Sequence, residues 1–202
     1  MVQLNANAKL SEHLASPSEA ALGHSNKLDG SHLSPNFTLG EFTKSGSHPE
    51  VYNIPSHEAI ANLKRLCTWL EELRKRNNDK YVVVKGDVST TLGMTEGGST
   101  LGMTNGSEEP IRLNSGYRSP QLNRAIGGAP TSNHLTGCAV DIRVEGMEQL
   151  IRYAAILLDY ADETHKDFDE LLIERNRYGA IWLHFAVRPK ENRHKVMFIN
   201  TN

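Results

Sequence analysis

Residues 132–141, with the sequence SNHLTGCAVD, carry the pattern that decides how this chain is interpreted. His134 stands in a short polar stretch that we expect to be a loop, and Asp141 stands in the apolar run that follows, which is typical of a strand. Gly137 lies between them and permits a tight bend that a residue with a Cβ would resist. The pattern indicates that His134 and Asp141 could turn back on one metal ion.

A third metal ligand would be needed, because a zinc enzyme holds its ion with about three protein ligands and leaves one position for water. His184 is the candidate, within residues 181–186, IWLHFA. A polar side chain that faces inward from the middle of such a strand is costly unless it has a partner. Spacing alone leaves other interpretations open. A strand histidine is more often a hydrogen-bonded core or surface residue, and an aspartate such as Asp141 can anchor a turn.

The composition is that of one globular domain. The chain has 202 residues, 38% hydrophobic and 23% charged, which is enough for a hydrophobic core. Its formal net charge of −2 gives no electrostatic reason to expect nucleic acid as a partner. No apolar run is long enough for a membrane span, and the N-terminus lacks the features of a signal peptide, so we expect synthesis in the cytoplasm. Cys67 and Cys138 are too few for a disulfide framework and are predicted to be buried free thiols.

Two parts of the chain stand apart from this domain. Residues 1–33 show no clear periodicity and are predicted to be a loosely ordered leader, followed by the domain at 34–202. Residues 88–109 hold a near repeat, STTLGMTEGG and STLGMTNGS, rich in Gly and Thr. Two short copies are too few for a repeat protein, so we expect a surface insertion. The pattern does not indicate its role.

The remaining periodicity predicts an α+β fold with a small, mainly antiparallel sheet flanked by helices. Apolar residues at helical spacing predict helices at 56–76, 120–126 and 147–160, with Ser56 and Ser119 as N-caps and a stop at Asn77. β-Branched or alternating runs predict strands at 81–84, 111–114, 139–144, 170–173, 181–187 and 195–199.

Three motifs in order resemble the M15 group of metallopeptidases, which includes D-Ala-D-Ala carboxypeptidases, dipeptidases and phage L-alanyl-D-glutamate endolysins. The motifs are SGYRSP at 115–120, S-x-H-x-x-G-x-A-x-D at 132–141, and W-x-H at 182–184. Further similarity to the single-domain type of this family lies in NFTLGEF at 36–42, LNRAIGGAP at 122–130 and FDELLIE at 168–174. The resemblance covers roughly residues 33–188, apart from the insertion.

The resemblance implies a zinc site in a cleft on the sheet, with the fold of D-Ala-D-Ala peptidases and hedgehog-like domains. It implies that His134, Asp141 and His184 bind Zn²⁺. It also implies that Arg118 lies in the substrate cleft, together with Ser132. A planar guanidinium suits this task, since it can hold a carboxylate or a polarised carbonyl through two hydrogen bonds. The alternative for Arg118 is a surface salt bridge after a turn.

The chain departs from the family pattern at the general base. Many relatives carry an acid three residues before the last histidine ligand, and here Ile181 occupies that position. Glu170 and Glu174 are the acids in the strand expected to pair with that of His184. The register of that pairing is expected to decide which of them faces the metal. Glu174 is the candidate base, with an ordinary solvent-facing glutamate as the alternative.

The sequence therefore predicts a zinc peptidase that cleaves next to a D-amino acid in peptidoglycan stem peptides. The alternative is a catalytically silent zinc-binding module of the same fold, for cell-wall recognition or a virion. A wall-directed enzyme without a signal peptide fits a phage or prophage lytic protein that is released to the periplasm or wall. The sequence does not distinguish D-Ala-D-Ala carboxypeptidase from L-Ala-D-Glu endopeptidase activity, and it does not indicate an oligomeric state.

Overall fold

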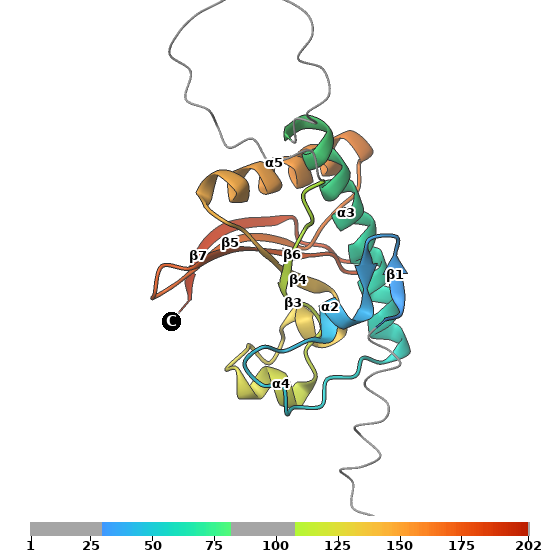
Figure 1. Ribbon diagram of the computed structural model, residues 1–202, viewed down its shortest axis with the longest axis vertical. Helices are drawn as coiled ribbons and strands as arrows, with labels where there is room; N and C mark the ends of the chain where they lie inside the picture. Colours follow the sequence, from blue (N-terminus) through green and yellow to red (C-terminus); the bar gives the residue numbers. More distant parts are fainter. Residues whose placement is uncertain (1–29, 82–107, 202) are drawn as a thin grey trace, which may run out of the picture.

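The computed structural model describes residues 30–81 and 108–201, whose helices and strands are drawn in Figure 1. Residues 1–29 of the predicted leader and residues 88–107 of the predicted insertion lie outside the described residues. His32 and Leu33, the end of the predicted leader, already belong to strand β1 (His32–Ser34). No helix within the described ranges is long and apolar enough to cross a membrane.

A small hairpin opens the described part of the chain. Strand β1 pairs antiparallel with β2 (Phe37–Thr38), which leads into the short helix α2 (Leu39–Thr43). The carboxylate of Glu41 accepts hydrogen bonds from the Thr38 backbone N–H at 2.7 Å and from its hydroxyl at 2.9 Å, so a capping box begins the helix. Glu71 accepts a bond from Ser34 at 2.6 Å and thereby attaches the hairpin to the long helix α3.

Five strands form the main sheet, in the order β3-β4-β6-β5-β7. Their bounds are Leu113–Ser115 for β3, Ala139–Arg143 for β4, Glu170–Asn176 for β5, Ile181–Ala186 for β6 and Lys195–Thr201 for β7. All neighbouring pairs are antiparallel except β5 and β7, which are parallel. The prediction of an α+β fold with a mainly antiparallel sheet is confirmed.

The two faces of this sheet differ in chemistry because side chains alternate along each strand. One face carries Ile142, Leu183 and Phe185, which are buried against α3 (His57–Tyr81) and α5 (Met147–Thr164). The other face carries Asp141 and His184, and we call it the polar face. Figure 1 shows α5 over one side of the sheet, with α4 (Pro120–Ala125) and α2 beyond the other side.

Helix α3 continues further than the sequence predicted. Its start is confirmed, since the Ser56 hydroxyl accepts from the Ala59 backbone N–H at 3.1 Å. The predicted stop at Asn77 is wrong: the helix runs to Tyr81, so Tyr81 is helical where a strand was expected, and residues 82–84 lie outside the described residues. Asn77 donates to Glu109 at 2.9 Å, and Asn78 accepts from the Glu109 backbone at 2.8 Å. These tertiary bonds engage the Asn77 amide nitrogen and the Asn78 side chain, which would otherwise compete with the helix backbone.

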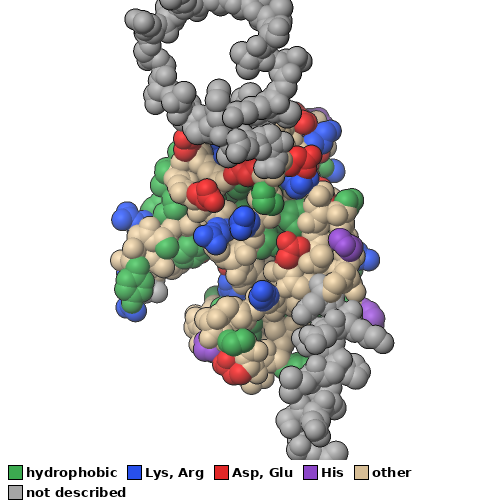
Figure 2. Space-filling view, in the orientation of Figure 1, with side chains coloured by type: hydrophobic (Ala, Val, Ile, Leu, Met, Phe, Trp, Pro, Cys, Tyr) green, Lys and Arg blue, Asp and Glu red, His purple; other side chains and the backbone are tan. Residues whose placement is uncertain are grey.

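Most other predictions hold with small shifts at the ends of elements. Ser119 caps α4, where its hydroxyl accepts from the Leu122 N–H, and α5 extends past the predicted end to Thr164. Strand β3 begins at Leu113 rather than at residue 111. Cys67 and Cys138 are buried and free, as expected. Figure 2 shows a hollow at the left of the molecule, between the sheet region and the part below it.

Candidate metal centre

Three side chains that the sequence singled out meet on the polar face of the sheet. His134 lies in the 3-10 helix η1 (Asn133–Thr136), Asp141 in β4 and His184 in β6. Asp141 and His184 are direct partners in the β4–β6 ladder, and Gly137 returns the chain from η1 to β4. One ligand atom from each of the three lies within 4.8 Å of the others, and the residues are only 2%, 7% and 7% exposed. Within residues 30–81 and 108–201, this is the one such group arranged to hold a metal ion.

Gly137 is required at the bend for two reasons. Its backbone has φ of 70°, a left-handed conformation that residues with a Cβ adopt only with strain. A Cβ at this position would also lie 2.6 Å from the Ala59 backbone oxygen in α3. The tight bend expected between His134 and Asp141 is therefore confirmed, and the contact with α3 adds a reason that the sequence did not show.

The backbone oxygen of Gly116 orients the ring of His134. The Nδ1 atom of His134 lies 2.6 Å from this oxygen, so Nδ1 is the donor and carries the proton. The Nε2 atom is then free of a proton and faces Asp141 Oδ1 at 3.3 Å. A bond from the second ring nitrogen to a carbonyl is how metal-binding histidines are commonly held in one tautomer.

The ring of His184 is hydrogen-bonded to Asp141 at Nδ1, and its Nε2 lies near Glu170 without a hydrogen-bond partner among the described residues. Its Nδ1 lies 2.9 Å from Asp141 Oδ1, and its Nε2 lies 3.6 Å from Glu170 Oε2. Burial alone would lower the pKa of His184, but the two carboxylates outweigh burial and raise it to about 9. Burial also acts against ionisation of Asp141, yet His134 and His184 hold its pKa well below the ordinary value. The site thus gathers one carboxylate and two imidazoles around a common point.

This set of donors fits zinc. Two imidazole nitrogens and one carboxylate oxygen are the ligands of many catalytic zinc sites, and such sites leave a further position open. The proton-free Nε2 of His134 and the Nδ1 of His184 both face the same oxygen of Asp141. The three candidate metal-ligand atoms are therefore directed towards one another. The resemblance had named these three residues as ligands, and the structure brings them together.

Arg118 contacts the candidate ligands directly. Its NH2 group donates to Asp141 Oδ2 at 2.5 Å, and its Nε donates to the Ser115 hydroxyl at 2.9 Å. Its backbone N–H also donates to the His134 oxygen at 3.0 Å. Arg118 therefore fixes Asp141 from the side opposite the histidines, a contact that the sequence did not suggest. A guanidinium has five N–H donors, so others remain for a substrate.

Ser132 has a structural contact in this part of the chain. It is the N-cap of η1, and its hydroxyl accepts from the His134 backbone N–H at 3.3 Å. The bond fixes the entry of the chain into the turn that carries His134. The role of Ser132 in substrate binding stays a prediction.

Glu170 and Glu174 lie on the same face of β5, and one prediction about them was wrong. Leu172 is the direct partner of His184, so the glutamates two positions to either side both share its face. The register therefore does not select between them. Ile181, three positions before His184, lies on the other face. Burial raises the pKa of Glu174, with nearby His184 acting against the rise, whereas the contact with His184 lowers the pKa of Glu170 to about 2.

A buried network behind η1 was not found from the sequence. Asp169 is fully buried, and it accepts from Asn133 at 2.7 Å and from the Arg193 guanidinium at 2.8 and 2.6 Å. Asn133 also donates to Glu170 at 3.0 Å. These bonds connect η1, which carries His134, to the start of β5. The only sequence signal was an aspartate directly after the apolar Phe168.

Asp169 gives a pH-dependent contribution to stability. Burial alone would raise its pKa, but Arg193 and Asn133 outweigh burial and lower it from 3.8 to about 2. A carboxyl group whose pKa is lower in the folded state stabilises the fold above its unfolded pKa, and the contribution is lost as the pH falls through about 2. We expect Asp169→Asn to lower the free energy of unfolding at pH 7 by about 2 to 4 kcal/mol.

Urea unfolding from pH 7 down to pH 2 measures this effect. The difference between wild type and Asp169→Asn should shrink as the pH drops below about 4, where the carboxylate of the unfolded chain takes up its proton. Asp167→Asn serves as the control, because the Asp167 side chain is 53% exposed, pairs with the exposed ring of His194 and otherwise accepts from the Phe168 backbone N–H. A difference that stays constant over this pH range would contradict the assignment.

Glu170 is expected to act on the metal through His184. Loss of its charge should weaken zinc binding by about tenfold to a hundredfold, as for other carboxylates that hold a ligating histidine. Competition with a chromophoric zinc chelator measures this for Glu170→Gln. Glu191→Gln, which changes an exposed glutamate, is the control. Equal affinity of wild type and Glu170→Gln would show that Glu170 does not position the histidine.

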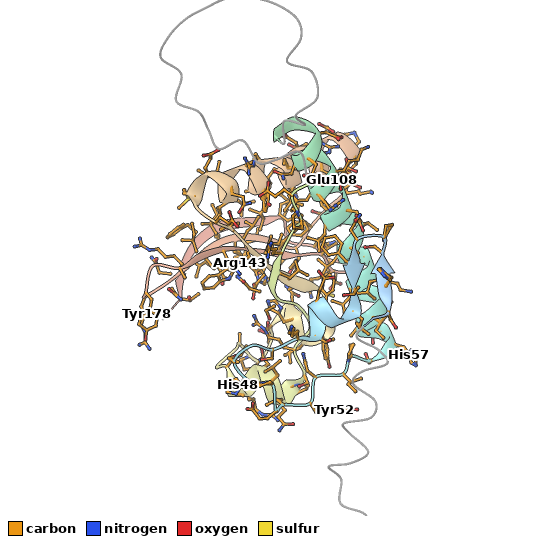
Figure 3. The ribbon with its side chains drawn as sticks, in the orientation of Figure 1. His48, Tyr52, His57, Glu108, Arg143 and Tyr178 are labelled. Atoms are coloured by element: carbon orange, nitrogen blue, oxygen red, sulfur yellow. The ribbon has the colours of Figure 1, made fainter. Side chains whose placement is uncertain are left out.

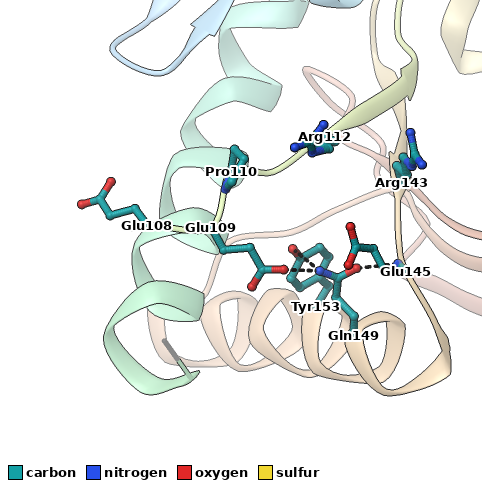
Figure 4. Close-up of a pocket in the computed structure, with 8 residues that line it drawn as sticks. All are labelled: Glu108, Glu109, Pro110, Arg112, Arg143, Glu145, Gln149 and Tyr153. Carbon is teal, nitrogen blue, oxygen red and sulfur yellow. Dashed lines mark hydrogen bonds between the residues drawn. The ribbon is translucent and has the colours of Figure 1, made fainter. Parts of the chain in front are cut away.

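A separate pocket of about 190 Å³ lies beside the end of β4, and Figure 4 shows it. It contains none of the three candidate ligands. In Figure 3, Arg143, which borders this pocket, lies between the sheet and the hollow that Tyr178 and His48 flank. The lining residues are Glu108, Glu109, Pro110, Arg112, Arg143, Glu145, Gln149 and Tyr153.

Comparison with known proteins supports the assignment that the motifs indicated. A family model described as Peptidase M15 matches residues 101–167. The matched segment contains Arg118, His134 and Asp141, while His184 lies beyond it. No curated protein matches the chain. The match over this segment supports an M15 family peptidase, and it does not distinguish the subtype.

Proposed function

We propose that this chain, whose residues 101–167 match the Peptidase M15 family model, is a zinc-dependent enzyme that cleaves peptidoglycan stem peptides next to a D-amino acid. The observation that carries the proposal is the buried group of His134, Asp141 and His184, whose donor atoms lie within 4.8 Å of one another. Buried charged groups are tolerated where they are paired or coordinate a metal, and two imidazoles with one carboxylate are a common zinc ligand set.

His134, Asp141 and His184 would hold the zinc ion. When bound, zinc would supply Lewis-acid polarisation of the scissile carbonyl and make water a better nucleophile at neutral pH. Arg118 and the Gly116 oxygen would keep two of the ligands in orientation through the bonds that they make to Asp141 and His134. The ligand set would thus be positioned before substrate arrives.

Glu174 would act as the general base. It shares the polar face with His184, and burial raises its pKa, which makes its carboxylate a better proton acceptor than an exposed glutamate. It stands two positions after Leu172, the ladder partner of His184, so it lies near the group. Glu174 would take a proton from the attacking water and pass it to the amine that leaves. Glu170 is less suited, since His184 and Arg193 hold it as an anion.

Arg118 would contact the substrate with the donors that Asp141 and Ser115 do not use. Its side chain is 14% exposed, so it can still be reached from solvent. The planar fork would hold a carbonyl oxygen or a carboxylate of the peptide next to the scissile bond. Ser132, at the start of η1, is proposed to lie beside the substrate.

The alternative of a catalytically silent zinc module depended on the missing acid at Ile181. Both Glu170 and Glu174 lie on the face of His184, which weakens that reason. We therefore propose an enzyme. We also propose that the protein is released to the periplasm or wall as a phage or prophage lytic protein. The experiment below identifies which peptide bond is cleaved.

Mass spectrometry of purified peptidoglycan fragments tests the proposal. Fragments are incubated with the zinc-loaded protein, with and without a chelator, and the mass of the product identifies the bond. Glu174→Gln should keep its zinc and lose about a hundredfold to ten-thousandfold in rate, the usual contribution of a general base. Glu148→Gln is the control, because that side chain is 75% exposed on α5.

The outcomes separate the two functions. A product that the chelator abolishes, and that Glu174→Gln forms far more slowly than Glu148→Gln, supports a metallopeptidase with this base. A protein that holds zinc but yields no product from any fragment would contradict the peptidase and favour the silent module. Full activity of Glu174→Gln would move the role of base to another residue.

A further inference from the structure

Two arginines stand opposite each other at the edge of the polar face. Arg143 ends β4, and its backbone N–H donates to the Arg112 oxygen at 2.8 Å. Leu113 and Ile142 are ladder partners, so Arg112 and Arg143 occupy the next position of the same ladder. Arg143 also follows Asp141 by two residues and faces Trp182 across the β4–β6 ladder. Side chains alternate along a strand, so Arg143 lies on the face of the candidate metal ligands.

Neither guanidinium has a salt bridge to any carboxylate of the described residues, and both arginines are exposed. Other arginines near the site are paired: Arg118 with Asp141 at 2.5 Å, and Arg193 with Asp169 at 2.6 Å. Like charges directly opposite in a ladder repel and destabilise the pair. This pair of arginines is therefore a position where a bound anion would relieve a repulsion within the protein.

The acids of the neighbouring pocket are mostly engaged elsewhere. Glu109 accepts from Asn77 at 2.9 Å and contacts Gln149, and Glu108 pairs with Arg74. Glu145 is the remaining acid of the pocket, and it is exposed. Figure 4 shows the two guanidinium groups directed to the same side, away from Glu109 and Gln149.

The position of Arg143 fits a substrate group close to the scissile bond. Two residues of a strand span about 7 Å, so the backbone of Arg143 is about one to two peptide residues away from that of Asp141. Figure 3 places Arg143 between the sheet and the hollow. A peptide that lies along the polar face at the metal ligands would bring its neighbouring residue to the two arginines.

We propose that Arg112 and Arg143 form a subsite for a free carboxylate of the peptide substrate, one or two residues from the scissile bond. The proposal rests on the proposed peptidase function and specifies its substrate class: acidic peptides over their amides. A planar guanidinium holds a carboxylate through two parallel hydrogen bonds, and two of them can share one carboxylate. That carboxylate can belong to a glutamyl residue within the peptide or to its C-terminus.

Two pairs of synthetic peptides separate these sources. The first pair is L-alanyl-γ-D-glutamyl-L-lysine with a free glutamyl carboxylate, and the same peptide with that group as a carboxamide. The second pair is L-lysyl-D-alanyl-D-alanine and its C-terminal amide. Binding is measured by calorimetry with the zinc-loaded Glu174→Gln protein, and chromatography confirms that the peptides stay intact. Hydrolysis by the zinc-loaded wild type is measured separately as kcat/KM.

In one of the two pairs, the carboxylate peptide should bind about tenfold more tightly than its amide, as expected for one or two partly exposed charge-assisted hydrogen bonds. Adding Arg143→Gln or Arg112→Gln to the Glu174→Gln protein should remove most of this preference, while the affinity for the amide peptide stays unchanged. Arg175→Gln is the matched control and should keep the preference, because Arg175 is an exposed arginine on the opposite face of β5.

Equal binding of carboxylate and amide in both pairs would overturn the proposal. So would a preference that survives the double change Arg112→Gln with Arg143→Gln, or one that Arg175→Gln removes equally. Hydrolysis distinguishes this failure from failure of the proposed function. Cleavage of the peptides without any preference for the carboxylate would support the proposed peptidase function and contradict the subsite. A preference for the carboxylate in binding, without any cleavage, would support the subsite and contradict the proposed peptidase function.

Discussion

The carboxylate of Asp141 is the contact on which the rest of the site depends. One of its oxygens faces both histidines, at 2.9 Å from His184 and 3.3 Å from His134, and the other accepts from Arg118 at 2.5 Å. A buried carboxylate is stable only when its charge is balanced and its lone pairs are satisfied. Each of the three partners therefore has to be held in place by another part of the fold. The surrounding structure does this in three separate ways.

The ladder between β4 and β6 fixes His184 directly across from Asp141, because side chains of ladder partners share a face. The bend at Gly137 against α3 and the Gly116 oxygen fix His134. Ser115, at the end of β3, fixes Arg118. The apolar face of the same sheet is buried against α3 and α5, so the core that stabilises the domain also holds the register of the site. A slip of one residue in β6 would turn His184 into that core.

The resemblance of three ordered motifs to the M15 family named the three candidate ligands and Arg118, whereas spacing alone left other interpretations open. The sequence also predicted the helices and most strands, because amphipathic periods are local signals. The errors have tertiary causes. Asn77 was expected to end α3, but its amide nitrogen donates to Glu109 of a distant segment. The parallel pairing of β7 with β5 is equally a property of the folded sheet.

The outer contacts of the site could not be predicted for the same reason. That Glu170 and Glu174 share a face could have been predicted from the sequence, because residues four apart in a strand point to the same side. They were instead treated as alternatives. The link from Asp169 to Asn133 joins distant positions and leaves no spacing pattern. The pairing of Arg112 with Arg143 depends on the ladder between β3 and β4, whose register only the structure gives.

X-ray absorption spectroscopy of the zinc-loaded protein tests the central claim most directly, since it reports the atoms that surround the metal. We predict about one zinc per chain, bound by two imidazole nitrogens and by oxygen, with no sulfur, and a loss of this signal in His134→Ala. A zinc–sulfur distance of about 2.3 Å would indicate a cysteine ligand and contradict the site. An unchanged spectrum in His134→Ala would show that the metal binds elsewhere.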